Sequence, residues 1–114
     1  MMAQVVHKVS PAVVRERIHA SPEEIAAFCR AHHIRWLALF GSVLRDDFRD
    51  DSDIDVLVEF AADYPVTFFD LYRIEEELSR RFNDRKTDLV TTASLHRLIR
   101  ERVLPLVEVQ YAER

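Results

Sequence analysis

Two short apolar runs separated by a polar loop dominate the hydrophobic pattern of this chain. The runs lie at 35–40 and 53–60, and both have the length and flanking turn residues typical of β-strands. The loop between them begins with Gly41-Ser42, and ten residues separate Ser42 from Asp53. Residues two apart on a strand share a face, so the two carboxylates that open the second strand should project together.

Capping signals predict helices around these strands. Ser21, followed by Pro22 and by Glu24, forms a capping box ahead of an amphipathic helix at 22–32. Thr67 can cap a second long helix, and Ser94 can cap a third that stops before Pro105. The other predicted elements are a helix at 11–19, a helical turn at 43–47, a strand at 86–91 and an edge strand or cover from 106–114. The predicted inward positions are Phe68, Leu71, Ile74, Leu78 and Phe82 in the second long helix, and Leu95, Leu98, Ile99 and Val103 in the third.

The alternation of strands and helices predicts an α/β (α+β) fold, in which a small mixed sheet lies under helices. A chain of 114 residues forms one domain. We expect residues 1–20 to be an N-terminal extension containing a short helix, and residues 21–114 to form the functional domain.

Composition narrows the functions that this domain can have. The chain is 48% hydrophobic and 32% charged, which is typical of a globular protein, and its net charge is −4. Binding to long nucleic acid needs many cationic contacts, so that partner is not expected. The single cysteine, Cys29, fits a reducing compartment and a place in the core. No segment has the length of a membrane span and the N-terminus lacks a signal peptide, so we expect a cytoplasmic protein.

Gly41 is the one glycine in the chain, although ordinary composition (roughly 7% glycine) would supply about eight. Every other turn is made without glycine. Position 41 is therefore expected to need a positive φ or a closely approaching group.

Carboxylates at the strand entrances indicate a metal site. Asp53 and Asp55 should share a face, and Asp88, which opens the later strand, is the natural third ligand. Hard oxygen ligands suit Mg²⁺ or Mn²⁺, and three of them could build a two-metal site for phosphoryl-type transfer. An EF-hand is excluded because Val56 and Ala62 occupy its glycine and glutamate positions.

Phosphate contacts are expected at the glycine turn. Gly41 and Ser42 offer backbone N–H groups and a hydroxyl, and Arg45, one helical turn after Ser42, could pair with a phosphate oxygen. Elsewhere, Phe68 and Phe69 are adjacent on a helix and cannot both point inward, so one of them could serve a partner surface.

Gly41-Ser42, ten intervening residues and Asp53-x-Asp55 together resemble the signature of the nucleotidyltransferase superfamily that includes DNA polymerase beta and kanamycin nucleotidyltransferase. Within that superfamily, the small size and the form GSVLRDDF…SDIDVLVEF are similar to the minimal nucleotidyltransferase (MNT) antitoxins, which are partners of HEPN-domain toxins. The resemblance runs from about Ser21 to Tyr111.

This resemblance implies an antitoxin that transfers AMP from ATP to a tyrosine of a HEPN toxin encoded by the adjacent gene. By position, Gly41 and Ser42 would hold the triphosphate and Asp53 and Asp55 the metals, while Asp88 would assist the metals and act as base. Both a homodimer and a hetero-oligomer with the toxin fit the sequence.

Two other functions stay open. The chain could be a non-catalytic subunit that neutralises a toxin by occlusion, or a small-molecule nucleotidyltransferase working as a homodimer. Retention of all three carboxylates favours catalysis, and the short length favours an acceptor that a protein partner brings.

Overall fold

The computed structural model describes residues 5–113 and contains a four-stranded sheet with the strand order β3-β2-β1-β4. The strands are β1 (Ile34–Phe40), β2 (Ile54–Phe60), β3 (Thr87–Thr91) and β4 (Glu108–Ala112). β1 is antiparallel to both β2 and β4, whereas β2 and β3 are parallel. This is the small mixed sheet that the sequence predicts, and the C-terminal segment supplies its edge strand.

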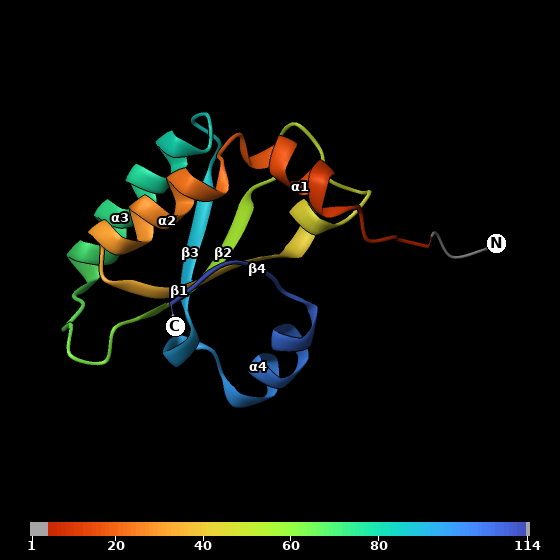
Figure 1. The fold of residues 1–114 in the computed structure, drawn as a ribbon. Helices are drawn as coiled ribbons and strands as arrows, with labels where there is room; N and C mark the ends of the chain where they lie inside the picture. Colours follow the sequence, from red (N-terminus) through yellow and green to blue (C-terminus); the bar gives the residue numbers. More distant parts are fainter. Residues whose placement is uncertain (1–4, 114) are drawn as a thin grey trace.

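Three helices cover one face of the sheet: α1 (Pro11–Ile18), α2 (Pro22–Ala31) and α3 (Phe68–Arg81). Figure 1 shows α2 and α3 side by side above the sheet, with α4 (Arg97–Val103) on its other side. Three short 3₁₀ turns complete the chain: η1 (Gly41–Leu44), η2 (Thr92–Ser94) and η3 (Leu104–Leu106).

Local signals explain where the covering helices begin. The Ser21 hydroxyl accepts a hydrogen bond from the Glu24 N–H while the Glu24 carboxylate accepts one from the Ser21 N–H, which completes the predicted capping box. Thr67 and Asp70 form a second box at the start of α3. Asn83 and Asp84 adopt positive φ angles just after α3, which turns the chain toward β3.

The main core lies between the sheet and α1, α2 and α3. Alternate residues of β1 and β2 point into it, and the helices add fully buried side chains that include Ile18, Cys29, Leu78 and Phe82. α1 contributes Val14 as well, so the N-terminal helix packs as part of the same body. The boundary predicted at residue 21 stays a prediction.

Several predictions from the helical pattern are wrong. Phe68, predicted to point inward, is 90% exposed, because the first turn of α3 takes no part in the core that Ile74 and Leu78 enter. Phe69, which lies outside the predicted inward stripe, is 84% exposed as well. Ser94 belongs to η2, where its N–H donates to the Thr91 hydroxyl, so it does not cap α4.

The last helix also differs from its prediction. α4 begins at Arg97, three residues after the predicted cap, and Ile99 is 52% exposed instead of pointing inward. A helix of seven residues placed on the second face of the sheet buries a narrower stripe than the sequence spacing suggests.

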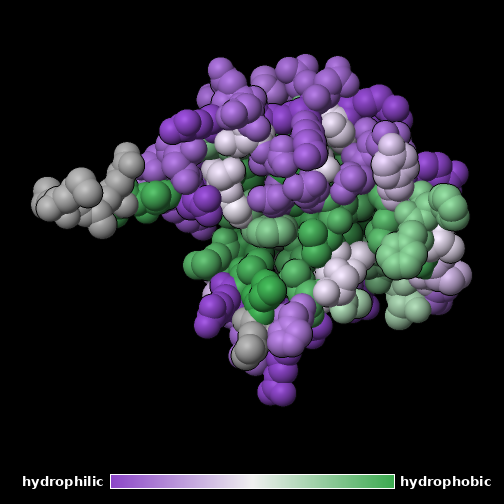
Figure 2. Space-filling model, turned by 180° about the vertical axis from the view of Figure 1, so that it is seen from behind, coloured by the Kyte–Doolittle hydropathy of each residue, from purple (hydrophilic) through white to green (hydrophobic). Residues whose placement is uncertain are grey.

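The surface has two contrasting halves when it is seen from behind. Figure 2 shows charged and polar side chains over the upper half and a belt of apolar side chains across the lower half. Large exposed apolar residues include Phe68, Phe69, Tyr72, Ile99 and Leu106. Within residues 5–113, no helix is long and apolar enough to cross a membrane.

Candidate active site

The predicted site residues meet at one end of the sheet, where β1 ends and β2 and β3 begin. Phe40, the last residue of β1, pairs with Asp55 in β2, and Asp55 pairs with Asp88 in β3. Because β2 and β3 are parallel and in register, the two carboxylates come from neighbouring positions on one face. Asp53 immediately precedes β2.

Gly41 directly follows β1 and lies against the Asp55 carboxylate. A Cβ atom at position 41 would stand 2.3 Å from Asp55 Oδ2 and 3.2 Å from its Cγ. The backbone φ of Gly41 is +77°, in the region that favours glycine. The sequence predicted either a positive φ or a close neighbour at Gly41, and the structure has both.

The turn that begins at Gly41 is held in place by two residues packed in the core. Val43 and Leu44 of η1 are buried in the core, so the turn holds a fixed position at the end of β1. The residue before the turn, Phe40, makes no side-chain hydrogen bond to the first backbone N–H groups of η1. These N–H groups and the Ser42 hydroxyl are therefore candidate donors to an oxyanion placed beside Asp55.

Electrostatics at Asp55 reflect this crowding. Burial raises the pKa of Asp55 above its ordinary value, and the nearby charges of Asp88 and Asp53 raise it further. The Arg45 guanidinium acts in the opposite direction and lowers it. The ionised form of Asp55 is thus held in an unfavourable field that a cation would relieve.

The third carboxylate, Asp53, is paired with a lysine. Asp53 Oδ2 lies 3.5 Å from Lys86 Nζ, an ion pair at the surface. Among residues 5–113, no group of three His, Cys, Asp or Glu side chains is arranged to hold a metal ion. Asp55 and Asp88 are the pair that could share Mg²⁺ or Mn²⁺, and Asp53, whose charge acts on Asp55, is the candidate third donor.

Arg45 lies near the site but not for the reason that the sequence suggested. The predicted helical turn at 43–47 is wrong, because η1 spans Gly41–Leu44 and Arg45 follows it in an extended conformation. The Arg45 side chain pairs with Asp47, with Nε 3.0 Å from Oδ1. Its pairing with a phosphate stays a prediction.

Sequence reasoning missed two arginines that fasten the loop between η1 and Asp53. The Arg17 Nη1 atom donates to the carbonyl oxygens of Val43, at 3.0 Å, and Arg45, at 2.6 Å. Arg85 Nε donates to the Ser52 carbonyl at 2.9 Å, and a second Arg85 nitrogen donates to the Arg49 carbonyl.

These two arginines enclose the Phe48 ring. The guanidinium carbon of Arg17 lies 4.8 Å from the ring centroid, and that of Arg85 lies 4.1 Å from it. We call the three side chains the Arg17–Phe48–Arg85 clamp. It ties the loop to α1 and to the segment before β3, and therefore sets the spacing between the glycine turn and the carboxylates. Isolated arginines in a charged chain carry no spacing signal from which this clamp could have been predicted.

Comparison with known sequences decides the family. The family described as "Polymerase beta, Nucleotidyltransferase" matches residues 23–109, well over half of the chain. The chain belongs to this nucleotidyltransferase family. The matched region contains all of the residues described above at the end of the sheet, from Gly41 to Asp88.

Individual relatives of this nucleotidyltransferase agree with the assignment. The protein named "Putative protein adenylyltransferase MJ0435" of Methanocaldococcus jannaschii is 34% identical over 73 residues, which cover 64% of this chain and 75% of the relative. A crystal structure of a toxin–antitoxin with AMP-PNP aligns with a TM-score of 0.68 and 20% identity, over 82% of this chain and 75% of the other.

A second solved structure contains a tri-AMPylated HEPN toxin of Shewanella oneidensis in complex with an MNT antitoxin. It aligns with a TM-score of 0.59 and 19% identity, over 80% of this chain and 69% of the other. At these identities the two structures establish the fold of this nucleotidyltransferase.

Gly41→Ala should destabilise the protein because an alanine would need a left-handed backbone and would collide with Asp55. The backbone part should cost about 1–2 kcal/mol, and the collision should add to it. In an Asp55→Ala background the collision is absent, so Gly41→Ala should there cost the backbone part alone. Urea denaturation of the four proteins measures this coupling. Equal costs in both backgrounds would show that Asp55 does not press against Gly41.

Asp55→Asn should stabilise the metal-free protein at neutral pH. Because the folded-state pKa of Asp55 is raised, the folded state binds a proton more readily than the unfolded state does, and the free energy of unfolding falls as pH rises above the ordinary Asp range. Asparagine does not ionise, so the free energy of unfolding of the variant does not fall in this way as the pH rises.

Thermal melts with a chelator present should therefore show a higher Tm for Asp55→Asn than for wild type at pH 7. The difference should shrink as the pH falls through the Asp range, where wild-type Asp55 becomes protonated. A variant that melts below wild type at pH 7 would show that the ionised carboxylate is favourably placed.

Proposed function

We propose that this nucleotidyltransferase is a protein adenylyltransferase of the antitoxin type, which transfers AMP from ATP to a tyrosine of a HEPN-domain toxin. The observation that carries the proposal is the pairing of Asp55 with Asp88 beside Gly41, which places two carboxylates next to a turn able to bind phosphates. The names of the relatives point to the same activity.

In the proposed site, the η1 turn binds the β- and γ-phosphates through backbone N–H groups and the Ser42 hydroxyl. Asp53, Asp55 and Asp88 would hold Mg²⁺ or Mn²⁺. When bound, this metal would neutralise charge on the phosphates and the leaving pyrophosphate.

The proposed transfer step uses these positions. The tyrosine oxygen of the acceptor forms a bond to the α-phosphorus, and the bond from that phosphorus to the bridging oxygen of the β-phosphate breaks. Pyrophosphate leaves with the bonding electron pair. Asp88 takes the tyrosine proton, because it lies beside Asp55 on the outer of the two parallel strands.

Surface features support a protein as the acceptor. Phe68, Phe69 and Tyr72 are 90%, 84% and 61% exposed, and an exposed aromatic group of this size is typical of an interaction surface. The net charge of −4 argues against a nucleic-acid acceptor.

One observation favours the non-catalytic alternative. Asp53 is paired with Lys86, and among residues 5–113 no three acidic, His or Cys side chains are arranged to hold a metal ion. A subunit that neutralises its partner by occlusion would need no such cage.

The two functions separate in a labelling experiment. The purified chain, incubated with α-³²P-labelled ATP, Mg²⁺ and the protein encoded by the adjacent gene, should place label on a tyrosine of that partner. Asp53→Asn combined with Asp55→Asn should reduce labelling by several orders of magnitude and abolish rescue of growth in cells that express the partner.

A matched control is available in the neighbouring loop. Asp50→Asn combined with Asp51→Asn removes the same charge from exposed positions and should leave labelling and rescue near wild type. If the Asp53/Asp55 variant rescues growth as well as wild type does, neutralisation proceeds by occlusion and the proposed catalysis is not its cause.

A further inference from the structure

Asp88 is the one candidate carboxylate that comes from an edge strand. In the sheet that residues 5–113 form, β2 is paired on both sides, with β1 and with β3, whereas β3 is paired with β2 alone. The position of Asp55 is therefore fixed by two neighbouring strands and that of Asp88 by one. Mg²⁺ demands a strict ligand geometry, so a cation shared by the two carboxylates requires that β3 be held firmly against β2.

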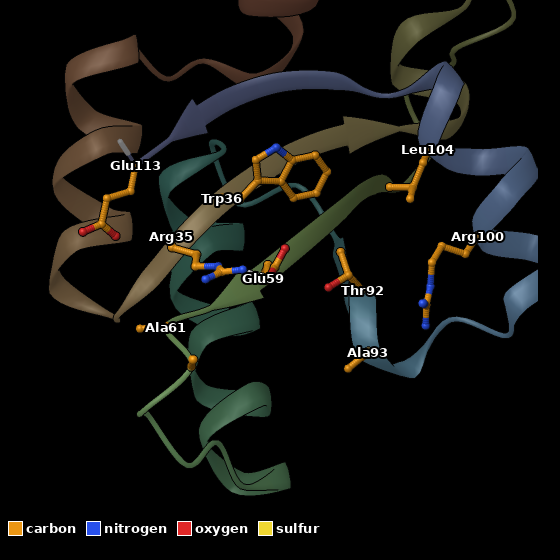
Figure 3. Close-up of a pocket in the computed structure, with 10 residues that line it drawn as sticks. Arg35, Trp36, Glu59, Ala61, Thr92, Ala93, Arg100, Leu104 and Glu113 are labelled. Carbon is orange, nitrogen blue, oxygen red and sulfur yellow. Dashed lines mark hydrogen bonds and ion pairs between the residues drawn. The ribbon is translucent and has the colours of Figure 1, made fainter.

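The far end of β3 lies beside a pocket. Thr92 and Ala93, which follow the strand, line this pocket together with Trp36 and Arg100. Figure 3 shows the two residues where β3 ends, with Arg100 across the pocket from them. This end of the strand is not enclosed, so contacts near Asp88 itself must keep the start of the strand in place.

The hydrogen-bond pattern of β3 shows which backbone groups face its open edge. The Ile54 N–H donates to the Lys86 carbonyl at 2.9 Å, and Asp55 pairs in register with Asp88. In a parallel ladder alternate residues of a strand bond to its neighbour, so the N–H and C=O groups of Asp88 face β2. The N–H of Leu89 faces the open edge, where another strand could otherwise accept it.

A side chain of α3 accepts this outward N–H. The Glu75 Oε2 atom accepts a hydrogen bond from the Leu89 N–H at 2.8 Å, in a partly buried position. One helical turn later, the Ser79 hydroxyl donates to the Arg85 carbonyl at 2.6 Å, just before the strand. α3 therefore holds β3 on the side opposite β2. An ionised acceptor makes a stronger hydrogen bond than a neutral one, so Glu75 is well suited to hold the strand.

We propose that Glu75 is a positioning residue for Asp88. The peptide that joins Asp88 to Leu89 directs its carbonyl at β2 and its N–H at Glu75. Because a peptide unit is planar, holding both groups fixes its orientation, and with it the direction of the Asp88 side chain. The inference rests on the proposed function, in which Asp88 shares the metal with Asp55 and takes the tyrosine proton.

Two substitutions at position 75 separate the hydrogen bond from the charge. Glu75→Asp keeps the charge but shortens the side chain by a methylene group, so the bond to the Leu89 N–H should be lost. Glu75→Gln removes the charge but keeps a side-chain oxygen that can accept the same bond.

Calorimetry then measures Mn²⁺ binding in the presence of a non-hydrolysable ATP analogue. Glu75→Asp should weaken Mn²⁺ binding by about tenfold or more, which is the usual effect of removing a group that orients a metal ligand. Glu75→Gln should bind Mn²⁺ nearly as tightly as wild type does. An effect of charge alone would reverse this order, because only Glu75→Gln loses a negative charge.

A matched control and a second background complete the experiment. Glu76 follows Glu75 on α3 and is exposed, so Glu76→Asp should leave Mn²⁺ affinity at the wild-type value. In an Asp88→Asn background, Glu75→Asp should lower the Tm of the chelator-treated protein as it does in wild type. It should no longer change Mn²⁺ affinity there, because the carboxylate through which it acts is gone.

Several outcomes would overturn the inference and leave the proposed function untouched. Glu75 has a structural role alone if Glu75→Asp leaves Mn²⁺ affinity unchanged, whatever its Tm. The inference is also wrong if Glu75→Gln weakens Mn²⁺ binding as much as Glu75→Asp does, or if the loss persists in the Asp88→Asn background. If wild type itself binds no Mn²⁺ with the analogue present, the proposed function fails and this inference fails with it.

Discussion

The close approach of Gly41 to the Asp55 carboxylate is the constraint on which the rest of the site depends. No side chain other than hydrogen fits at position 41 while Asp55 keeps its place, because a Cβ would stand 2.3 Å from the carboxylate oxygen. The same contact brings the turn that we propose binds phosphates beside the carboxylates. In the proposed transfer, a phosphate-binding element and the carboxylates must contact one triphosphate, and the absence of a side chain at position 41 lets the two lie next to each other.

Strand register and packing hold the two partners of this contact in place. The register of β1, β2 and β3 aligns Phe40, Asp55 and Asp88 in one row, so Gly41 follows directly from the row. Burial of Val43 and Leu44 fixes the turn from beneath, and the Arg17–Phe48–Arg85 clamp fixes the loop that returns to β2. The resulting crowding of carboxylates raises the pKa of Asp55, an unfavourable arrangement of the kind expected at functional sites.

The sequence was informative where one local pattern decides the structure. Strand spacing predicted the mixed sheet, the Ser21 capping box and the Thr67 cap predicted the starts of α2 and α3, and the isolated glycine predicted a positive φ or a close neighbour at Gly41. Prediction from the sequence failed where the burial of a residue depends on how far its helix extends over the neighbouring element. Phe68 continues the apolar spacing of α3 but lies outside the core, and Ile99 does the same on α4. The Arg17–Phe48–Arg85 clamp combines residues from segments far apart in the chain, and periodicity holds no information about such contacts.

The central claim is that the end of the sheet at Gly41, Asp55 and Asp88 is where cation and triphosphate meet. NMR of the ¹⁵N-labelled protein with Mn²⁺ and a non-hydrolysable ATP analogue tests it directly, because Mn²⁺ broadens the resonances of nearby nuclei. Substoichiometric Mn²⁺ should broaden the amide resonances of Gly41, Asp55 and Asp88 first, and should leave those of Cys29 and the other buried core residues of α2 sharp. Preferential broadening in the exposed acidic loop at 46–51, with the three site amides unaffected, would contradict the account.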